Sequence, residues 1–190
     1  MTDLLIGMAV FLGMHSIAIV APHWRDRMAL RLGAQAWRGV YSLLSLAGLL
    51  LIIHGFGLAR SAPTYWYVPA PWLHSLTRLL MVPVFPLLLA AYLPGRIKAA
   101  AKHPMLAAVK LWACAHLLSN GTAADVVLFG GLLAWAIVDR ISLKQRPARA
   151  VAGAPPSKWN DAIAIVLGLA LYAVFVGWAH LRLFGVSPLG

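Results

Sequence analysis

Apolar runs long enough to cross a bilayer recur along the whole chain. A transmembrane helix needs about 20 mostly apolar residues. Hydrophobic residues make up 62% of the 190 positions and charged residues only 11%, whereas a soluble domain has about a quarter charged residues. The pattern predicts an all-α, polytopic integral membrane bundle of about six helices that forms one domain over residues 1–190. We expect the helices at 3–21, 39–59, 73–93, 104–119, 123–139 and 160–184.

Basic residues gather in alternate loops of this arrangement. The chain has 16 Lys and Arg against five acidic residues, and twelve of the basic residues lie in the loops at 22–38, 94–103 and 140–159. Such clusters between apolar runs are typical of cytoplasmic loops in inner-membrane proteins, which argues against nucleic acid as the partner of this charge. The positive-inside rule predicts a multi-pass inner-membrane protein with both termini on the non-cytoplasmic side.

Two of the expected helices depart from a simple span. The helix at 73–93 contains Pro83 and Pro86, which should kink it. The helix at 104–119 would rise about 24 Å, less than the roughly 30 Å hydrocarbon core, and Lys110 lies inside it. Between the last two helices, the stretch at 144–158 is rich in Pro, Ala and basic residues and is expected to be a loop.

Five histidines fall inside the expected helices, and two of them, His74 and His180, are expected at the membrane interface. The other three lie deeper, where buried polar groups mark candidate functional sites. On the expected topology, His15 lies about 18 Å below the outer edge and His116 about 18 Å above the inner edge. Their depths then differ by about 6 Å across a core of about 30 Å. His54, about 8 Å below the outer edge, is the weaker candidate. His15 and His116 could ligate a haem iron from two helices, or each could form a packing hydrogen bond to a neighbouring helix.

Other polar groups suggest smaller roles. Lys110 follows His103 by seven residues on one stripe of the same helix, and with Lys102 these two residues form a candidate cationic seat for an anion. Snorkelling of the lysine toward the headgroups is the alternative. Cys114 should face away from His116 and is expected to be a buried apolar residue. Asp125 is expected to pair with a basic group at the outer side.

Four segments of the chain resemble the NnrU family of bacterial inner-membrane proteins. The resemblance rests on FLGMHS at 11–16, KHPML at 102–106, KLWACAHLLSNG at 110–121 and LFGG at 128–131. It implies a link to nitrite and nitric oxide reduction in denitrification, with no settled biochemical activity. NnrU proteins are also similar to the plant zeta-carotene isomerase, a haem b protein. The haem-ligating histidines of that enzyme match His15 and His116 by motif position, so the resemblance implies a b-type haem.

The resemblance leaves alternatives open. A haem-dependent isomerase would act on a lipophilic polyene such as a carotenoid precursor. However, Ala113 stands where the isomerase has a Cys that serves as an alternative ligand, and Trp135 lies near the position of a further histidine of that enzyme. The His103-Pro104 pair also resembles the RHP element of membrane methyltransferases, with Lys102 in place of the Arg. A non-haem scaffold or a methyltransferase-like protein is therefore a third hypothesis.

Overall fold

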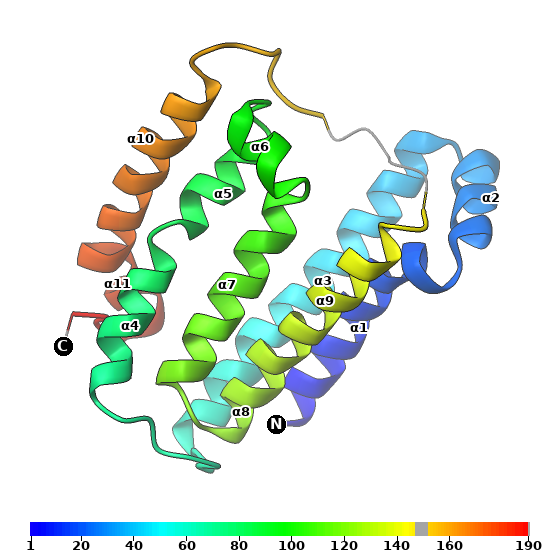
Figure 1. Ribbon diagram of the computed structural model, residues 1–190. Coiled ribbons are helices and arrows are strands. Elements are labelled where there is room, and N and C mark those ends of the chain that lie inside the picture. The colour runs from blue at the N-terminus through cyan, green and yellow to red at the C-terminus, as the bar shows by residue number, and fades with distance from the viewer. Residues whose placement is uncertain (147–151, 190) are drawn as a thin grey trace. The chain divides into compact units, whose positions relative to one another are not determined.

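The chain folds into helices joined by turns and loops, and it divides into two compact units (Figure 1). The computed structural model describes residues 1–146 and 152–189. Unit 1 comprises Met1–Tyr67 and Gly121–Ser142, and unit 2 comprises Val68–Asn120 and Leu143–Gly190.

Unit 1 is built on two long antiparallel helices whose backbones approach closely at glycines. Gly48 of the second helix lies against Phe11 of the first, where a Cβ would stand 2.8 Å from the Phe11 nitrogen. Gly131, the first residue of the last helix of the unit, lies against Met8 of the first helix. Small residues allow such close packing between membrane helices. The elements are α1 (Thr2–Val20), α2 (Pro22–Leu32), α3 (Ala34–Ser61), α8 (Ala123–Asp125), the π-helix η1 (Val126–Gly130) and α9 (Gly131–Ser142).

A backbone clasp closes unit 1 where the chain returns to it. The Trp66 N–H donates to the Gly121 carbonyl at 2.8 Å, and the Ala123 N–H donates to the Thr64 carbonyl at 2.8 Å. Gly121 is buried against the Tyr67 carbonyl, which leaves no room for a side chain. These contacts hold the chain where it enters α8.

The Tyr67 side chain lies at the same place. Burial, with the negative charge of Asp125 as the second cause, raises the pKa of the Tyr67 phenol above its ordinary value of 10.0.

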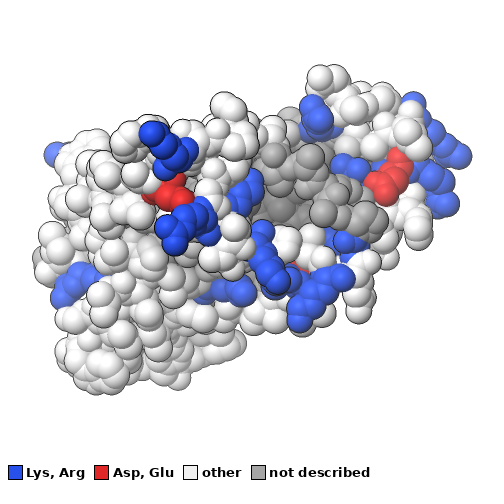
Figure 2. Space-filling view, turned by 45° about the horizontal axis from the view of Figure 1, so that its top comes forward, with Lys and Arg blue, Asp and Glu red and all other residues white. Residues whose placement is uncertain are grey.

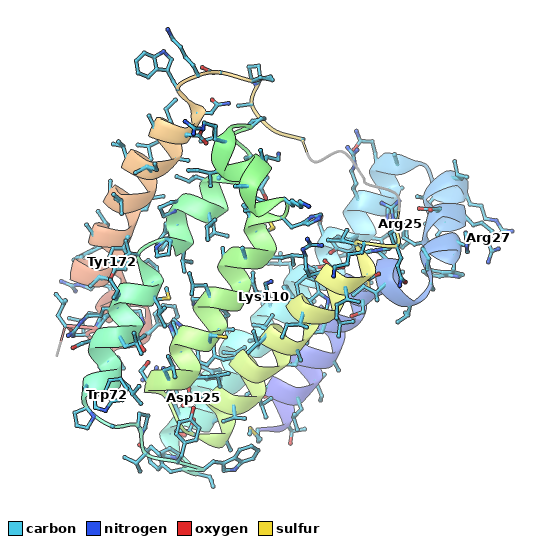
Figure 3. All side chains as sticks on the ribbon, viewed as in Figure 1. Arg25, Arg27, Trp72, Lys110, Asp125 and Tyr172 are labelled. Carbon is cyan, nitrogen blue, oxygen red and sulfur yellow. The ribbon has the colours of Figure 1, made fainter. Side chains whose placement is uncertain are left out.

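In unit 2, α5 packs against both α7 and α10, and α4 packs against α7. Thr77 on α4 donates from its hydroxyl to the Ala115 carbonyl on α7 at 2.8 Å. Tyr172, labelled in Figure 3, donates from its hydroxyl to the Arg78 carbonyl at 2.8 Å. Gly168 of α10 lies against Pro86 of α5. The elements are α4 (Trp72–Met81), α5 (Val84–Ala90), α6 (Arg96–Ala101), α7 (Pro104–Ser119), α10 (Asn160–Val174), the π-helix η2 (Phe175–Ala179) and α11 (His180–Phe184).

The expected kink is confirmed as a break between α4 and α5. Pro83 has no N–H, so it cannot donate to the Leu79 carbonyl four residues earlier. The Val82 N–H donates to that carbonyl instead, at 3.2 Å, in a tighter turn. The helix resumes at Val84, and the Leu87 N–H donates back to the Pro83 carbonyl at 3.0 Å.

Two polar residues at the start of α10 hold the turn that precedes α6. The carboxylate of Asp161 accepts the backbone N–H groups of Arg96 and Ile97 at 2.8 and 3.0 Å. The side-chain amide of Asn160 donates to the Pro94 carbonyl at 2.8 Å and to the Pro155 carbonyl at 3.1 Å. Asp161 therefore caps α6, whose first N–H groups have no partner within the helix.

Helix boundaries follow the sequence predictions with specific corrections. The helix expected at 104–119 is confirmed as α7 with the same bounds, and the helix expected at 160–184 is confirmed with the π-turn η2 inside it. The prediction that 22–38 is only a loop is wrong, because α2 lies there. Pro22 begins α2 in a favoured first position, and Gly33, with a φ of 83°, ends it. Of the loop expected at 144–158, residues 147–151 lie outside the described residues.

Four helices are long and apolar enough to cross a membrane in the described part of the chain. They are Thr2–Val20, Ala34–Ser61, Trp72–Ala90 and Asn160–Phe184. The apolar helix Pro104–Ser119 is shorter. Figure 2 shows a surface with wide areas that carry no charged side chain. This all-helical architecture is that of a membrane protein.

Candidate functional site

His15 lies on α1, half-buried, with its ring held by its own helix. Its Nδ1 is 2.7 Å from the Phe11 carbonyl oxygen, and its ring stacks on the Phe11 ring at a centroid distance of 4.1 Å and an angle of 28°. A carbonyl oxygen can only accept a hydrogen bond, so Nδ1 carries the proton. In the neutral imidazole Nε2 then keeps its lone pair, which is the form that ligates a metal.

Aromatic side chains from two other helices surround this imidazole. Tyr41 of α3 lies with its ring centroid 5.4 Å away, and Trp135 of α9 lies 5.7 Å away with its ring perpendicular. Within the described part of the chain, the buried indole nitrogen of Trp135 has no hydrogen-bond acceptor. Three helices of unit 1 therefore fix the plane of the His15 ring, and the motif FLGMHS supplies both the imidazole and the ring that stacks on it.

His116 on α7 repeats this local geometry. Its Nδ1 is 2.9 Å from the carbonyl oxygen of Trp112, one turn earlier, and the two rings lie 5.2 Å apart at an angle of 51°. The same reasoning assigns the proton to Nδ1 and the lone pair to Nε2. The His116 carbonyl accepts the N–H of Asn120 at 2.9 Å, which ties the end of α7 to the imidazole-bearing turn.

The two histidines belong to different units. His15 lies in Met1–Tyr67 of unit 1 and His116 lies in Val68–Asn120 of unit 2. The expectation that the two imidazoles meet at one level and share a metal stays a prediction. Among the described residues, no group of three or more His, Cys, Asp or Glu residues could hold a metal ion.

The other four residues predicted for the site lie on α3, at the start of α7 and within α7. His54 is exposed on α3, with its Nε2 3.5 Å from the Asp3 carboxylate. Lys102 is exposed, with a φ of 59°, just before α7. His103 precedes the first residue of α7, and Lys110 lies half-buried within that helix. The sequence did not predict the contact between His54 and Asp3, which arises because the antiparallel pairing of α1 and α3 brings the start of α1 next to the end of α3.

Two expectations are corrected. Cys114 is exposed, whereas its neighbours Ala113 and Ala115, which point to nearly opposite sides of α7, are buried. Among the residues that the structure describes, Asp125 does not form the expected ion pair with a basic group. Its carboxylate accepts the Thr122 hydroxyl at 2.6 Å and the Thr122 N–H at 3.0 Å, while the Thr122 hydroxyl accepts the Asp125 N–H at 3.2 Å. These reciprocal contacts form a capping box at the start of α8.

Comparison with known proteins gives a family for the whole chain. The profile described as "NnrU protein" matches residues 3–188. Neither the curated proteins nor the solved structures contain a match. The matched region runs across both units and includes His15, His116 and the clasp at Gly121, so the chain belongs to the NnrU family.

Proposed function

We propose that this protein binds a b-type haem through His15 and His116 and acts in nitrite or nitric oxide metabolism in denitrification. The observation that carries the proposal is that the two imidazoles make the same hydrogen bond to their own helices. Each has its Nδ1 held by the carbonyl four residues earlier, at 2.7 and 2.9 Å. Ligating histidines are typically anchored through the second ring nitrogen in this way, which fixes the tautomer and the orientation of the ring.

The donor set of the chain fits a b-type haem. Two neutral imidazoles are a ligand pair that haem iron accepts in helical bundles. A bound haem would supply an iron centre for electron transfer or for binding a small ligand. Phe11 and Trp135 would keep the His15 ring in one orientation, and the ammonium groups of Lys102 and Lys110, with the His103 imidazole as a further hydrogen-bonding group, suit the propionates. His54 is the weaker candidate because its Nε2 lies next to a carboxylate.

The proposal also includes the number of membrane spans and the side of the membrane on which the termini lie. We propose six spans in the bacterial inner membrane, with α7 and the α8–α9 segment as the two spans beyond the four long helices. The twelve basic residues in alternate loops support a non-cytoplasmic location of both termini. A reporter fused to the C-terminus tests this orientation: alkaline phosphatase should be active there and green fluorescent protein dark. The opposite pattern would refute the six-span arrangement.

Difference spectroscopy tests the haem. The full chain, purified in mild detergent after expression with a haem precursor, should give a reduced-minus-oxidised spectrum with b-type bands. His15→Ala and His116→Ala should each abolish or strongly reduce these bands. His54→Ala and His180→Ala, which remove histidines outside the proposed pair, should retain them. A colourless wild-type protein, or bands that survive both substitutions, would overturn the proposal.

A haem-dependent isomerase is the alternative that uses the same two histidines. It needs a lipophilic polyene as substrate. Two features weigh against it: Trp135, whose indole can only donate a hydrogen bond, stands beside His15, and the buried Ala113 provides no thiolate. Incubation of the reduced haem protein with a cis-carotenoid precursor, followed by chromatography of the products, separates the two functions. A non-haem scaffold or a methyltransferase-like protein is the hypothesis left if no haem binds.

A further inference from the structure

The segment between α1 and the membrane-crossing part of α3 folds into a basic helical hairpin, defined here as residues 22–38. It contains α2 and the first turns of α3, with Gly33 between them at a φ of 83°. The Trp24 and Trp37 rings meet edge to face at 6.0 Å, and Trp37 is buried. The hairpin is therefore a packed structure and not an extended linker.

Helix lengths place the hairpin at the end of the bilayer. The 19 residues of α1 rise about 28 Å and the 28 residues of α3 about 42 Å, against a hydrocarbon core of about 30 Å. The antiparallel contacts of Leu4 with Gly55 and of Phe11 with Gly48 set the register of the two helices. This register puts the end of α1 level with about residue 39. Residues 22–38 consequently lie beyond α1, at the depth of the lipid headgroups and past it.

The hairpin presents cations together with an apolar side chain. It carries four arginines and one acidic residue, Asp26. Arg25 pairs with Asp26 at 2.9 Å, whereas Arg27 and Arg31 are exposed and have no acidic partner among the described residues. Figure 3 shows Arg27 pointing away from the rest of unit 1. Leu30, between these two arginines in sequence, is 84% exposed.

We propose that the basic hairpin binds the headgroups of anionic phospholipids in the leaflet that it adjoins. Guanidinium groups form paired hydrogen bonds with phosphate oxygens, and a cluster of arginines next to a transmembrane helix is attracted to anionic lipid. Leu30 enters the boundary between headgroups and acyl chains, as apolar residues of interfacial helices do. This inference stands on the charge and depth of the hairpin and is independent of haem.

Native mass spectrometry of the full chain tests the proposal. Protein in neutral detergent is titrated with phosphatidylglycerol and, separately, with phosphatidylcholine. Wild type should retain phosphatidylglycerol in preference to phosphatidylcholine. The double variant Arg27→Gln/Arg31→Gln should bind phosphatidylglycerol about 30-fold more weakly, because each arginine near an anionic surface contributes about fivefold. Leu30→Gln should weaken binding of both lipids.

A matched variant tests whether the lipid binds to the hairpin in particular or to positive charge anywhere on the protein. Arg60→Gln/Arg182→Gln removes the same charge from exposed positions outside the hairpin and should leave phosphatidylglycerol binding within about twofold of wild type. Circular dichroism and gel filtration confirm that each variant is folded. Equal loss in the two double variants, or a wild type without preference for phosphatidylglycerol, would overturn the proposal. The second result would direct attention to an acidic protein as the partner of the hairpin.

Discussion

Gly55 of α3 lies directly on the backbone of Leu4 in α1, so close that a Cβ at position 55 would stand 2.8 Å from the Leu4 Cα. Gly7 and Gly48 make similar contacts along the same interface. The three glycines let the two helices approach without side chains between them, and dispersion between the closely packed backbones stabilises the pair in lipid. The same interface carries His15 on one side and Tyr41 on the other, so it sets the distance between these two rings.

Gly55→Ala should destabilise unit 1 by about 1–3 kcal/mol, because the added methyl group forces α1 and α3 apart. Gly57→Ala is the matched control: apart from its own helix, no described residue has an atom within 4 Å of its Cβ position, and alanine is the better helix former by up to about 1 kcal/mol. Unfolding in mixed micelles, followed by circular dichroism, measures both variants. Equal stability of the two would show that the close approach does not matter for folding.

Gly121→Ala should open the clasp of unit 1. The new methyl group would overlap the Tyr67 carbonyl and break the hydrogen bond from the Trp66 N–H to the Gly121 carbonyl. We expect a loss of about 1–3 kcal/mol and faster hydrogen exchange at the Trp66 and Ala123 amides. Gly130→Ala serves as the control, since among the described residues beyond its own helical backbone a Cβ there would meet only a methyl group of Val126, at 4.0 Å. Unchanged exchange in Gly121→Ala would contradict the geometry of the clasp.

Asp161→Ala should release the start of α6. Loss of an N-terminal cap costs about 0.5–2 kcal/mol, and the carboxylate here accepts two backbone N–H groups. Hydrogen exchange should become faster at Arg96 and Ile97, while Asp161→Asn should keep part of the protection through its amide oxygen. Asp26→Asn, in an exposed ion pair with Arg25, should leave these amides unchanged. Protection that persists in Asp161→Ala would refute the capping role.

The sequence predicts the long helices well and the contacts between them poorly. Apolar length locates α1, α7 and the final helix within a few residues, because burial in lipid demands it. It misses α2, where the arginines dilute the apolar signal and only Pro22 and Gly33 mark the ends. The Thr122–Asp125 capping box follows a local spacing of Thr and an acidic residue three positions later, so the capping role of Asp125 could have been predicted from the sequence. The contact between Asp3 and His54 depends on the register of α1 against α3, which no local pattern reveals.

For the candidate site, residue type and depth select His15 and His116, but they do not show which ring nitrogen faces the backbone. That depends on whether each imidazole turns back to the carbonyl four residues earlier, a choice of side-chain rotamer. The aromatic neighbours of His15 come from α3 and α9, far away in sequence. Their identity follows only from the packing of unit 1.

Trp135 should control how firmly His15 holds the proposed haem. Its ring meets the imidazole edge to face at 5.7 Å, and its N–H makes no hydrogen bond in the described part of the chain. Trp135→Phe keeps an aromatic edge and loses only an N–H without an acceptor, so haem affinity should stay near the wild-type value. Trp135→Leu removes the edge-to-face aromatic contact and should lower haem affinity about tenfold, the lower end of the cost of losing a residue that supports a metal-ligating histidine. Haem titration of the apoprotein, followed at the Soret band, measures all three proteins. If Phe and Leu lower affinity equally, the indole N–H matters and the edge contact does not; if neither changes it, Trp135 does not support the ligand.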